Sequence, residues 1–558
     1  PSGVMTVNLA LDPMPTGAST NGQLASLFGY ALQLDVTRMQ FGASPAIGNL
    51  PGALGAKGPD ANLEIVTGSD EYMNLFPELG RTANGIWRAF NADGTLLWAK
   101  DTRSDESKSS VNIVDLDANG SDPEIVGGTT SGWNMEALDK NGNLIWSFPY
   151  PPHTTGSFMW HSSPAADELN GGSPGFEVVA GNNPKSSVWC FAGRPDGTNR
   201  GISVGSLDPE RNPNNWGYPT TIGTEGVDWD VLWVSTADGA VIATPAIADL
   251  DNDGQKDVVA SSTKGVVYAL NGSNGALKWK FTASSSVYSS AGVGDIDGDG
   301  LPDVVFGSDN GMVYALAGGS GAVKWSFSVG GSTTMWSSPA LADLDGDLSA
   351  EVVLGAGNGR VYALSGSSGA VKWSYAAGAP VLSSPALARR NTGEPLSVYV
   401  GDEAGRLHVI NGATGARIDT MFFSSGSLRT SPAVADIDGD GKLELAYTQY
   451  GQIGDNDTFR MLRDNGSAVA SRTLPWPMFR GNPARTGSLL PAVSTAPASV
   501  PGCSVTRNVK KDGSADHVMI QAAVDALAKT LIGDACVVVR DTQTYNEQVT
   551  VEGFANNG

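Results

Sequence analysis

SPALADLDGDLSAEVVLGAGNGRVYALSGSSGAVKWSY, residues 338–375, contains the repeated unit that decides the fold. Residues 244–281, TPAIADLDNDGQKDVVASSTKGVVYALNGSNGALKWKF, match it almost position for position. Each unit holds four short segments rich in β-branched residues, which Gly, Asn and Ser turns separate, and no segment has a helical period. Four strands in a repeat of this length are typical of a β-propeller blade.

The number of repeats predicts the size of the ring. The same opening pattern occurs eight times, in ASPAIG (43–48), SVNIVDLD (110–117), SSPAADE (162–168), ATPAIADLD (243–251), SSAGVGDID (289–297), SSPALADLD (337–345), SSPALARR (383–390) and TSPAVADID (430–438). We therefore predict an all-β fold with an eight-bladed propeller over residues 43–488. Seven blades are the alternative, because the first unit is long and irregular.

Five of the units carry an acidic loop, and four of these have carboxylates at positions 1, 3, 5 and 9 of a nine-residue stretch such as DLDNDGQKD (249–257). The first copy, DLDANGSDPE (115–124), has Asn119 at position 5. Asp, Asn and Gly also make ordinary turns, but five copies at nearly fixed spacing favour a cation site. Calcium accepts six to eight oxygen ligands at flexible geometry, whereas zinc prefers nitrogen and sulfur. We expect about five calcium ions. The predicted side-chain ligands are Asp115, Asp117, Asn119, Glu124, Asp249, Asp251, Asp253, Asp257, Asp295, Asp297, Asp299, Asp303, Asp343, Asp345, Asp347, Glu351, Asp436, Asp438, Asp440 and Glu444, with the backbone carbonyls of Gln255, Leu301, Ser349 and Lys442 at position 7.

Three units lack the full cation pattern. They are the first, the third and the seventh, in which Arg389 and Arg390 replace the acids. We therefore expect calcium to stabilise individual blades without being a requirement of every blade. A tryptophan recurs near the fourth segment of five units, and we expect it to pack between neighbouring blades; these residues are Trp98, Trp146, Trp279, Trp325 and Trp373.

The charge of the chain follows largely from these loops. The net charge is −23, and three acids in the first loop and four in each of the other four make 19 of the 58 acidic residues. An acidic surface disfavours nucleic acid as a partner. No apolar run approaches the roughly 20 residues of a membrane span, so we expect no membrane insertion in this segment.

Two known families resemble parts of this repeat. The acidic loop followed by a short apolar strand resembles the FG-GAP or VCBS repeat of integrin-type propellers, in which calcium sits between the first two strands of a blade. VYALNGSNGALKW (267–279) and its copies resemble quinoprotein-type propeller repeats. The segment WPMFRGNPARTG (476–487) looks like the stretch that closes such repeats. We expect it, or the strand TVNLAL within the N-terminal segment 1–42, to complete a blade and join the ends of the ring.

The composition changes after residue 488. Residues 489–502 form a linker rich in Pro, Ala and Ser. Residues 503–558 resemble the opening of a pectinesterase-like right-handed parallel β-helix, on the match of DGS, a helix over 520–527, CVVVR (536–540) and TYNEQVTV (544–551). We expect only about one coil of this β-helix here and a longer native polypeptide. Cys503 and Cys536 could pair, leaving Cys190 free, and the sequence leaves this open.

Functional residues are expected outside the repeat. The insertion at 193–230 contains Trp216, Tyr218 and Trp229, which could contact a ligand or pack within their own loop. The chain lacks an HExxH motif, and its paired carboxylates belong to the cation loops. We therefore favour a secreted or cell-surface binding, adhesion or structural module with a protein or glycan partner. Alternatives are a pectic lyase-like enzyme with a calcium propeller, and a self-assembling unit of a surface layer or filament.

Overall fold

The structure is a computed structural model built from β-strands. It describes residues 43–51, 53, 62–71, 84–101, 109–116, 123–128, 135–148, 162–169, 175–183, 186–193, 231–331, 333–347, 349–391, 393–422, 427–448, 458–464, 477–482 and 485–488, and the strands 9–10, 28–35, 39–40, 505–509, 530–531, 535–539 and 555–556. These residues contain no helix. Among them there is accordingly no helix long and apolar enough to cross a membrane. The chain divides into two compact units, Pro1–Ser488 and Leu489–Gly558, each of which is described by itself.

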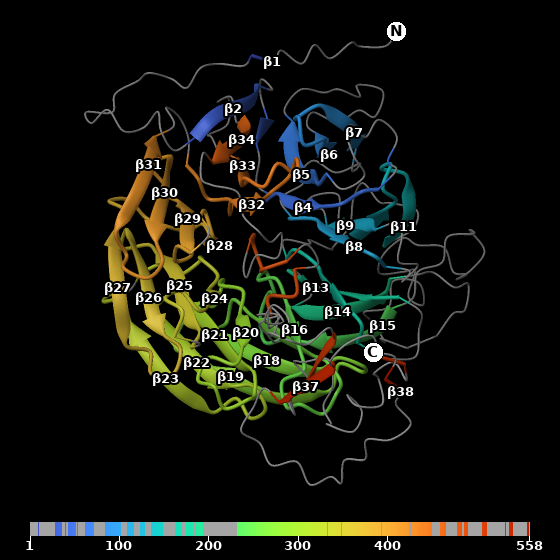
Figure 1. Ribbon diagram of the computed structural model, residues 1–558. Coiled ribbons are helices and arrows are strands. Elements are labelled where there is room, and N and C mark those ends of the chain that lie inside the picture. The colour runs from blue at the N-terminus through green and yellow to red at the C-terminus, as the bar shows by residue number, and fades with distance from the viewer. Residues whose placement is uncertain are drawn as a thin grey trace, which may run out of the picture. The chain divides into compact units, whose positions relative to one another are not determined.

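The first unit consists of eight antiparallel sheets (Figure 1). Blades 1 to 4 contain β4 (Ala46–Gly48), β5 (Glu64–Glu71), β6 (Asn84–Phe90) and β7 (Leu96–Asp101), with β3 (Met39–Gln40) beside β5; β8 (Asn112–Val114), β9 (Glu124–Gly128), β10 (Met135–Leu138) and β11 (Leu144–Phe148); β12 (Ala165–Asp167), β13 (Glu177–Asn182), β14 (Ser187–Ala192) and β15 (Val231–Thr236); and β16 (Ala246–Ala248), β17 (Asp257–Ser261), β18 (Val266–Asn271) and β19 (Leu277–Thr282).

Blades 5 to 8 continue the same order. They contain β20 (Gly292–Gly294), β21 (Asp303–Ser308), β22 (Met312–Ala317) and β23 (Val323–Ser328); β24 (Ala340–Ala342), β25 (Glu351–Ala356), β26 (Arg360–Ser365) and β27 (Val371–Ala376); β28 (Ala386–Ala388), β29 (Ser397–Gly401), β30 (Arg406–Asn411) and β31 (Arg417–Phe422); and β32 (Ala433–Ala435), β33 (Glu444–Thr448) and β34 (Thr458–Asp464), followed by β2 (Phe28–Asp35) and β1 (Leu9–Ala10). The prediction of eight blades is confirmed, and the seven-bladed alternative is wrong.

Blade 8 is completed by the N-terminal part of the chain. Strand β2 pairs antiparallel with β34, so that Leu32 lies opposite Met461. Of the expected closing strand, TVNLAL, the structure describes only β1, which pairs with the outer edge of β2. FGYALQLD (28–35) takes the closing position, and its backbone pairs with β34 from Thr458 to Asp464, which covers the edge of that strand.

The short first strand of each blade lies next to that of the following blade, from β4 round to β32 and back to β4. A circle of hydrogen bonds precedes these strands. Backbone amides donate to the serine hydroxyl of the next blade in seven cases, at 2.9–3.1 Å. One of them, from the Ser431 amide to Ser44 Oγ, joins blade 8 to blade 1 across 387 residues of sequence. The serines of the repeated openings thus hold the ring closed.

The cores lie between blades. One apolar cluster, for example, joins Ile47 and Ile65 of blade 1 to Ala433 and Ala446 of blade 8. The predicted inter-blade tryptophans are confirmed, because each indole N–H donates to a backbone carbonyl of the next blade. The pairs are Trp98 with Lys140, Trp146 with Gly193, Trp279 with Gly318, Trp325 with Gly366 and Trp373 with Gly412, at 2.5–2.9 Å.

A sixth tryptophan has the same role. Trp233 Nε1 donates to the carbonyl of Gly272 at 2.7 Å. The repeat alignment does not predict it, because the long insertion before β15 displaces the fourth strand of blade 3. The indole rings press on glycines of the neighbouring turn: a Cβ atom at Gly275 would lie 2.6 Å from the Trp233 ring, and Gly275 has a φ of 69°. The turn therefore requires glycine for both space and backbone conformation.

The segment 477–488, here the central segment, does not close the ring as expected. It lies within the ring and bonds to the first strands of several blades (Figure 1). The buried Arg485 side chain donates to the carbonyls of Ser44 and Val111, in blades 1 and 2. Arg480 donates to those of Pro245 and Ala291, in blades 4 and 5. The two arginine side chains of the central segment thus donate hydrogen bonds to backbone carbonyls of four blades. A strand within a blade does not have this role.

The second unit contains two parallel strand pairs. Strand β35 (Val505–Val509) pairs with β37 (Ala535–Val539), and β36 (Thr530–Leu531) pairs with β38 (Ala555–Asn556). The predicted strand CVVVR overlaps β37. The predicted linker, the helix over 520–527 and the segment 544–551 lie outside the described residues.

Candidate metal centres

The acidic loops lie between the first and second strands of their blades. Their fourth and sixth positions take the left-handed backbone conformation, with φ of 55° at Asn252 and 85° at Gly254, and 79° at Gly298 and 83° at Gly300. A Cβ atom at Gly254 or Gly300 would meet nothing within 4 Å. Glycine is therefore needed there for its backbone conformation and not for space, and this tight coil turns successive odd positions toward one centre.

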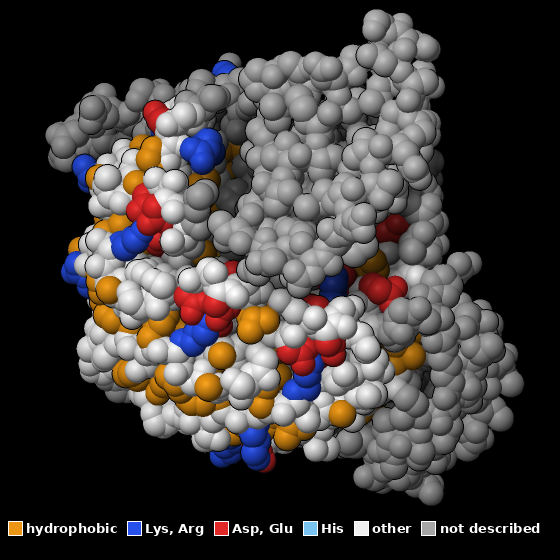
Figure 2. Space-filling model, turned by 60° about the horizontal axis from the view of Figure 1, so that its bottom comes forward, with side chains coloured by type: hydrophobic (Ala, Val, Ile, Leu, Met, Phe, Trp, Pro, Cys, Tyr) orange, Lys and Arg blue, Asp and Glu red, His pale blue; other side chains and the backbone are white. Residues whose placement is uncertain are grey.

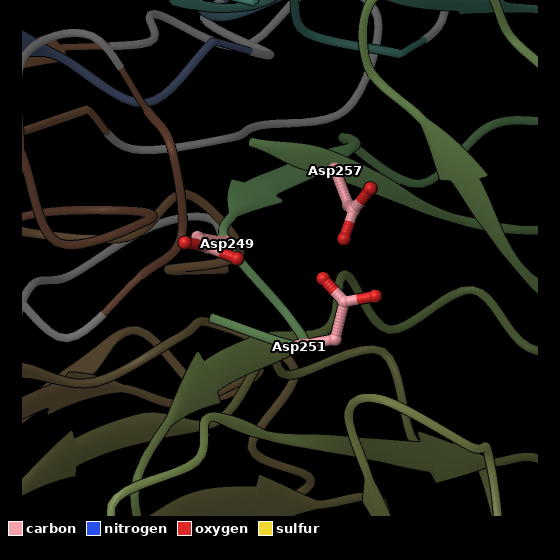
Figure 3. A group of neighbouring side chains, drawn as sticks. All are labelled: Asp249, Asp251 and Asp257. Carbon is pink, nitrogen blue, oxygen red and sulfur yellow. The ribbon is translucent and has the colours of Figure 1, made fainter. Parts of the chain in front are cut away.

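The loop of blade 4 brings three carboxylates together. Asp249, Asp251 and Asp257 each have an oxygen within 4.8 Å of the others. Figure 3 shows that the carboxylates of Asp251 and Asp257 face each other across a gap. Asp253 is not part of this group; its Oδ1 accepts a hydrogen bond from the Gln255 amide at 2.8 Å.

The loops of blades 5 and 6 also group three carboxylates, but from positions 1, 3 and 5 rather than 1, 3 and 9. Asp295, Asp297 and Asp299 form one group and Asp343, Asp345 and Asp347 the other, with the same 4.8 Å limit between oxygens. The amides of Leu301 and Ser349 at position 7 each donate to the carboxylate at position 5, at 2.8 Å. The ninth residues, Asp303 and Glu351, begin β21 and β25 and are 0% and 1% exposed.

The loop of blade 8 groups Asp436, Asp438 and Glu444 within the same limit. Asp440 lies outside the group, and its Oδ1 accepts a hydrogen bond from the Lys442 amide at 2.8 Å. In blade 2 the structure describes Asp115 and Glu124, while Asp117 and Asn119 lie outside the described residues. So do Trp216, Tyr218 and Trp229, the predicted ligand-contact aromatics.

The acid at position 9 also has a structural role that the sequence pattern did not predict. Glu444 Oε2 accepts a hydrogen bond from the Ile437 amide at 2.9 Å, across its loop. The same bond, at 2.7 Å, joins Glu64 to Leu50 in blade 1 and Glu177 to Leu169 in blade 3. Because blades 1 and 3 lack the cation pattern, this carboxylate closes the loop whether or not the other acids are present.

Lysine side chains enter three of the acidic groups, and the repeat pattern did not identify them as part of the site. Lys278 Nζ lies 2.7 Å from Asp251 and 2.8 Å from Asp257. Lys324 Nζ lies 2.7, 2.8 and 2.9 Å from Asp297, Asp299 and Asp303. Lys372 Nζ lies 2.8, 3.1 and 2.6 Å from Asp345, Asp347 and Glu351. On one face of the protein, acidic patches alternate with adjoining basic patches (Figure 2).

Burial and these ion pairs oppose each other in setting the pKa values. Burial raises the pKa of Asp303 to about 6, although the Lys324 ammonium lowers it. Burial also disfavours the charge on Lys324, but hydrogen bonds to Asp297, Asp299 and Asp303 outweigh this effect and raise its pKa. In blade 8, burial raises the pKa of Glu444 to about 8, and the charges of Asp440 and Asp436 add to this effect. Glu444 would thus be protonated at neutral pH without a cation nearby, because its pKa lies above 7.

The groups offer the oxygen ligands that calcium prefers, at separations that a calcium ion could span. Calcium–oxygen distances are about 2.3–2.6 Å, so two oxygens on opposite sides of one ion lie about 4.6–5.2 Å apart. The oxygens in each group lie within 4.8 Å of one another. Magnesium binds oxygen at about 2.0–2.1 Å and usually keeps several of its waters, so a group of several carboxylates suits it less well. The donors are all oxygen, which also disfavours zinc.

His408 has a structural environment. Its ring is 1% exposed, and its Nε2 lies 3.0 Å from Asp402, which also pairs with Arg406 at 2.6 Å. Its Nδ1 lies 3.1 Å from the Tyr375 hydroxyl of the preceding blade. At the preceding blade junction, Phe327 and Tyr362 hold the equivalent positions and make an aromatic contact. His408 therefore lies in a blade junction, which fits a packing role.

Comparisons with known proteins agree on the fold. A family model described as outer membrane protein assembly factor BamB matches residues 230–437. No curated protein sequence matches the chain. Among solved structures, Saccharomyces cerevisiae Sqt1 is similar with a TM-score of 0.51 and 12% identity, over 77% of this chain and 97% of that one. The V. cholerae biofilm matrix protein Bap1 has a TM-score of 0.50 and 15% identity, over 80% and 90%. At these identities the likeness shows the fold alone.

Proposed function

We propose that this chain is a calcium-stabilised propeller that serves as a binding or structural module of a secreted or cell-surface protein. The observation that carries this proposal is the recurrence of four acidic groups at one position in four blades. Each joins the first and second strands of its blade, so that an ion there would fix a turn of the scaffold. Extracellular calcium, at millimolar concentrations, would fill even weak sites of this kind.

The sequence and the comparisons support this assignment in different ways. The acidic loops resemble the FG-GAP or VCBS repeat, and this resemblance favours calcium over a turn without an ion. The propeller fold, which the chain shares with a biofilm matrix protein, is compatible with such a module. The partner on this proposal is a protein or a glycan, or a further copy of the chain, contacted through loops carried on the rigid ring.

The proposal for the second unit is the beginning of a parallel β-helix. The parallel pairing of β35 with β37 supports it, because the paired positions Val505 and Ala535 are 30 residues apart, as successive coils of a solenoid would be. A further parallel pair, β36 with β38, fits the same arrangement.

The calcium assignment is tested by thermal unfolding of the full chain. A ligand that binds only the folded state stabilises it by mass action. We expect a lower Tm and faster proteolysis in chelator than in calcium, and recovery on addition of calcium but much less with magnesium. Identical melting curves in chelator and in calcium would contradict structural calcium.

The pectic lyase alternative is tested separately. Incubation of the calcium-loaded protein with acidic pectic polymers should give no rise in the absorbance of unsaturated sugars. A rise that disappears with the protein omitted would show that the propeller supports catalysis, and the module would then be an enzyme.

A further inference from the structure

The three lysines reach the acidic loops because of a shared irregularity in their sheets. In blade 4, Trp279 lies opposite Ala269, but Leu277 lies opposite Leu270, so that Lys278 is the extra residue of a β-bulge. Lys324 is the extra residue of the same bulge in blade 5, and Lys372 in blade 6. A β-bulge redirects a side chain that regular pairing would send elsewhere. Here it directs the ammonium groups toward the loop carboxylates.

The residue at the bulge differs in the other blades. In blades 1, 3 and 7, whose loops lack the cation pattern, it is Leu97, Leu232 and Ile418. In blade 2 it is Ile145, which packs against the core between blades 2 and 3. A bulge therefore occurs in every one of these blades, but lysine occupies it only where the structure also shows a group of loop carboxylates. The pairing of lysine with acidic loop is consequently not a general requirement of the blade.

The ammonium groups occupy the position that an ion would take. Lys324 Nζ is within 2.9 Å of oxygens from Asp297, Asp299 and Asp303. A calcium ion bound to the same oxygens at about 2.3–2.6 Å would lie in the same small volume as this nitrogen. Two cations in such a volume repel each other strongly, so that only one can be present.

We infer that Lys278, Lys324 and Lys372 are internal cations that hold the acidic loops of blades 4, 5 and 6 when no divalent ion is bound, and that a calcium ion must displace them. This inference rests on the proposed calcium function. The lysines then set the affinity of these loops: they keep the acids paired when the calcium concentration is low, and they weaken binding by competing for the same oxygens. Removing the charge of one lysine should strengthen calcium binding in its loop.

Chemical labelling tests displacement in the unaltered full chain. After treatment with chelator, the protein is acetylated briefly at its lysines, with and without saturating calcium, and each site is quantified by mass spectrometry. We expect the reactivity of Lys278, Lys324 and Lys372 to rise several-fold in calcium, because a displaced ammonium enters solvent. Lys280 lies on the same strand as Lys278, is 53% exposed in its side chain and lies 3.7 Å from Asp238; its reactivity should not change.

A substitution tests competition. Lys324→Met keeps the length of the side chain and removes its charge, and calcium titration calorimetry should then show one loop that binds about tenfold tighter or more. Lys280→Met is the matched control and should titrate like the wild type. In chelator, Lys324→Met should melt at a lower temperature than Lys280→Met, and calcium should restore it.

The possible results separate this inference from the proposed function. If the wild type binds calcium, but lysine labelling is the same with and without calcium and the affinity is the same with and without the Lys324 charge, the lysines do not compete. The inference is then overturned, while the calcium function stands. If neither the wild type nor Lys324→Met binds calcium by calorimetry or melting, the proposed function fails and the inference fails with it.

Discussion

At the level of single residues, the tryptophan of a fourth strand carries much of the contact between two blades. Trp325 is 8% exposed and donates a 2.5 Å hydrogen bond to Gly366 of the next blade. Trp325→Ala removes this bond and leaves a cavity, so we expect a loss of about 3–5 kcal/mol in the free energy of unfolding. Trp336→Ala is the control on an exposed surface, since Trp336 is 42% exposed. Denaturant unfolding of both variants measures the difference, and equal losses would contradict the inter-blade role.

A second residue-level prediction concerns Glu444 in chelator. Burial raises its pKa to about 8 from an ordinary value of 4.5. Between these values the folded protein holds a proton that the unfolded chain has released, so the free energy of unfolding falls as pH rises through this window. We expect Glu444→Gln to remove this contribution to the pH dependence, whereas Glu394→Gln at an exposed turn should keep it. Thermal melts across pH 4.5–8 measure the slope, and parallel curves for wild type and Glu444→Gln would refute this prediction.

At the level of elements, the central segment acts as a common bonding partner for several blades. Burial lowers the pKa of Arg485 to about 9, so the guanidinium remains charged at neutral pH. Its hydrogen bonds to Ser44 and Val111 satisfy buried carbonyls that a shorter side chain would leave unpaired. We therefore expect Arg485→Met to lower the free energy of unfolding by about 2–4 kcal/mol.

The control for this prediction is Arg429→Met. Arg429 forms an ion pair with Glu403 at 2.8 Å, and its side chain is 45% exposed. Exposed pairs contribute only up to about 1 kcal/mol. Chemical unfolding followed by tryptophan fluorescence compares the two, and a larger loss for Arg429→Met would mean that the central segment contributes little to the stability of the ring.

At the level of the whole molecule, the sequence predicted what repeats and missed what is unique. The blade number, the inter-blade tryptophans and the position of the acidic loops followed from matches between units. The path of residues 477–488 did not, because only the closed ring shows that Arg480 and Arg485 face carbonyls from four blades. Lys278 was missed for a similar reason: its neighbours in the chain indicate an exposed strand, and only the bulge in the register places it beside Asp251 and Asp257.

The join between β2 and β34 also determines how the ring would carry tension. Consider a pull between residues 28–35 and 477–488. At its first end, the pull loads the antiparallel pair of β2 and β34, which has seven register pairs between Phe28 and Asp35. At its second end, the pull on the central segment reaches the inner strands of several blades at once. The amides of Ile247, Val293 and Val434 form hydrogen bonds to that segment. Force is therefore shared among blades where the chain leaves the ring, but is concentrated on one strand pair where it enters. The closing strand would yield first, and the ring would open at blade 8 before any other blade lost its shape.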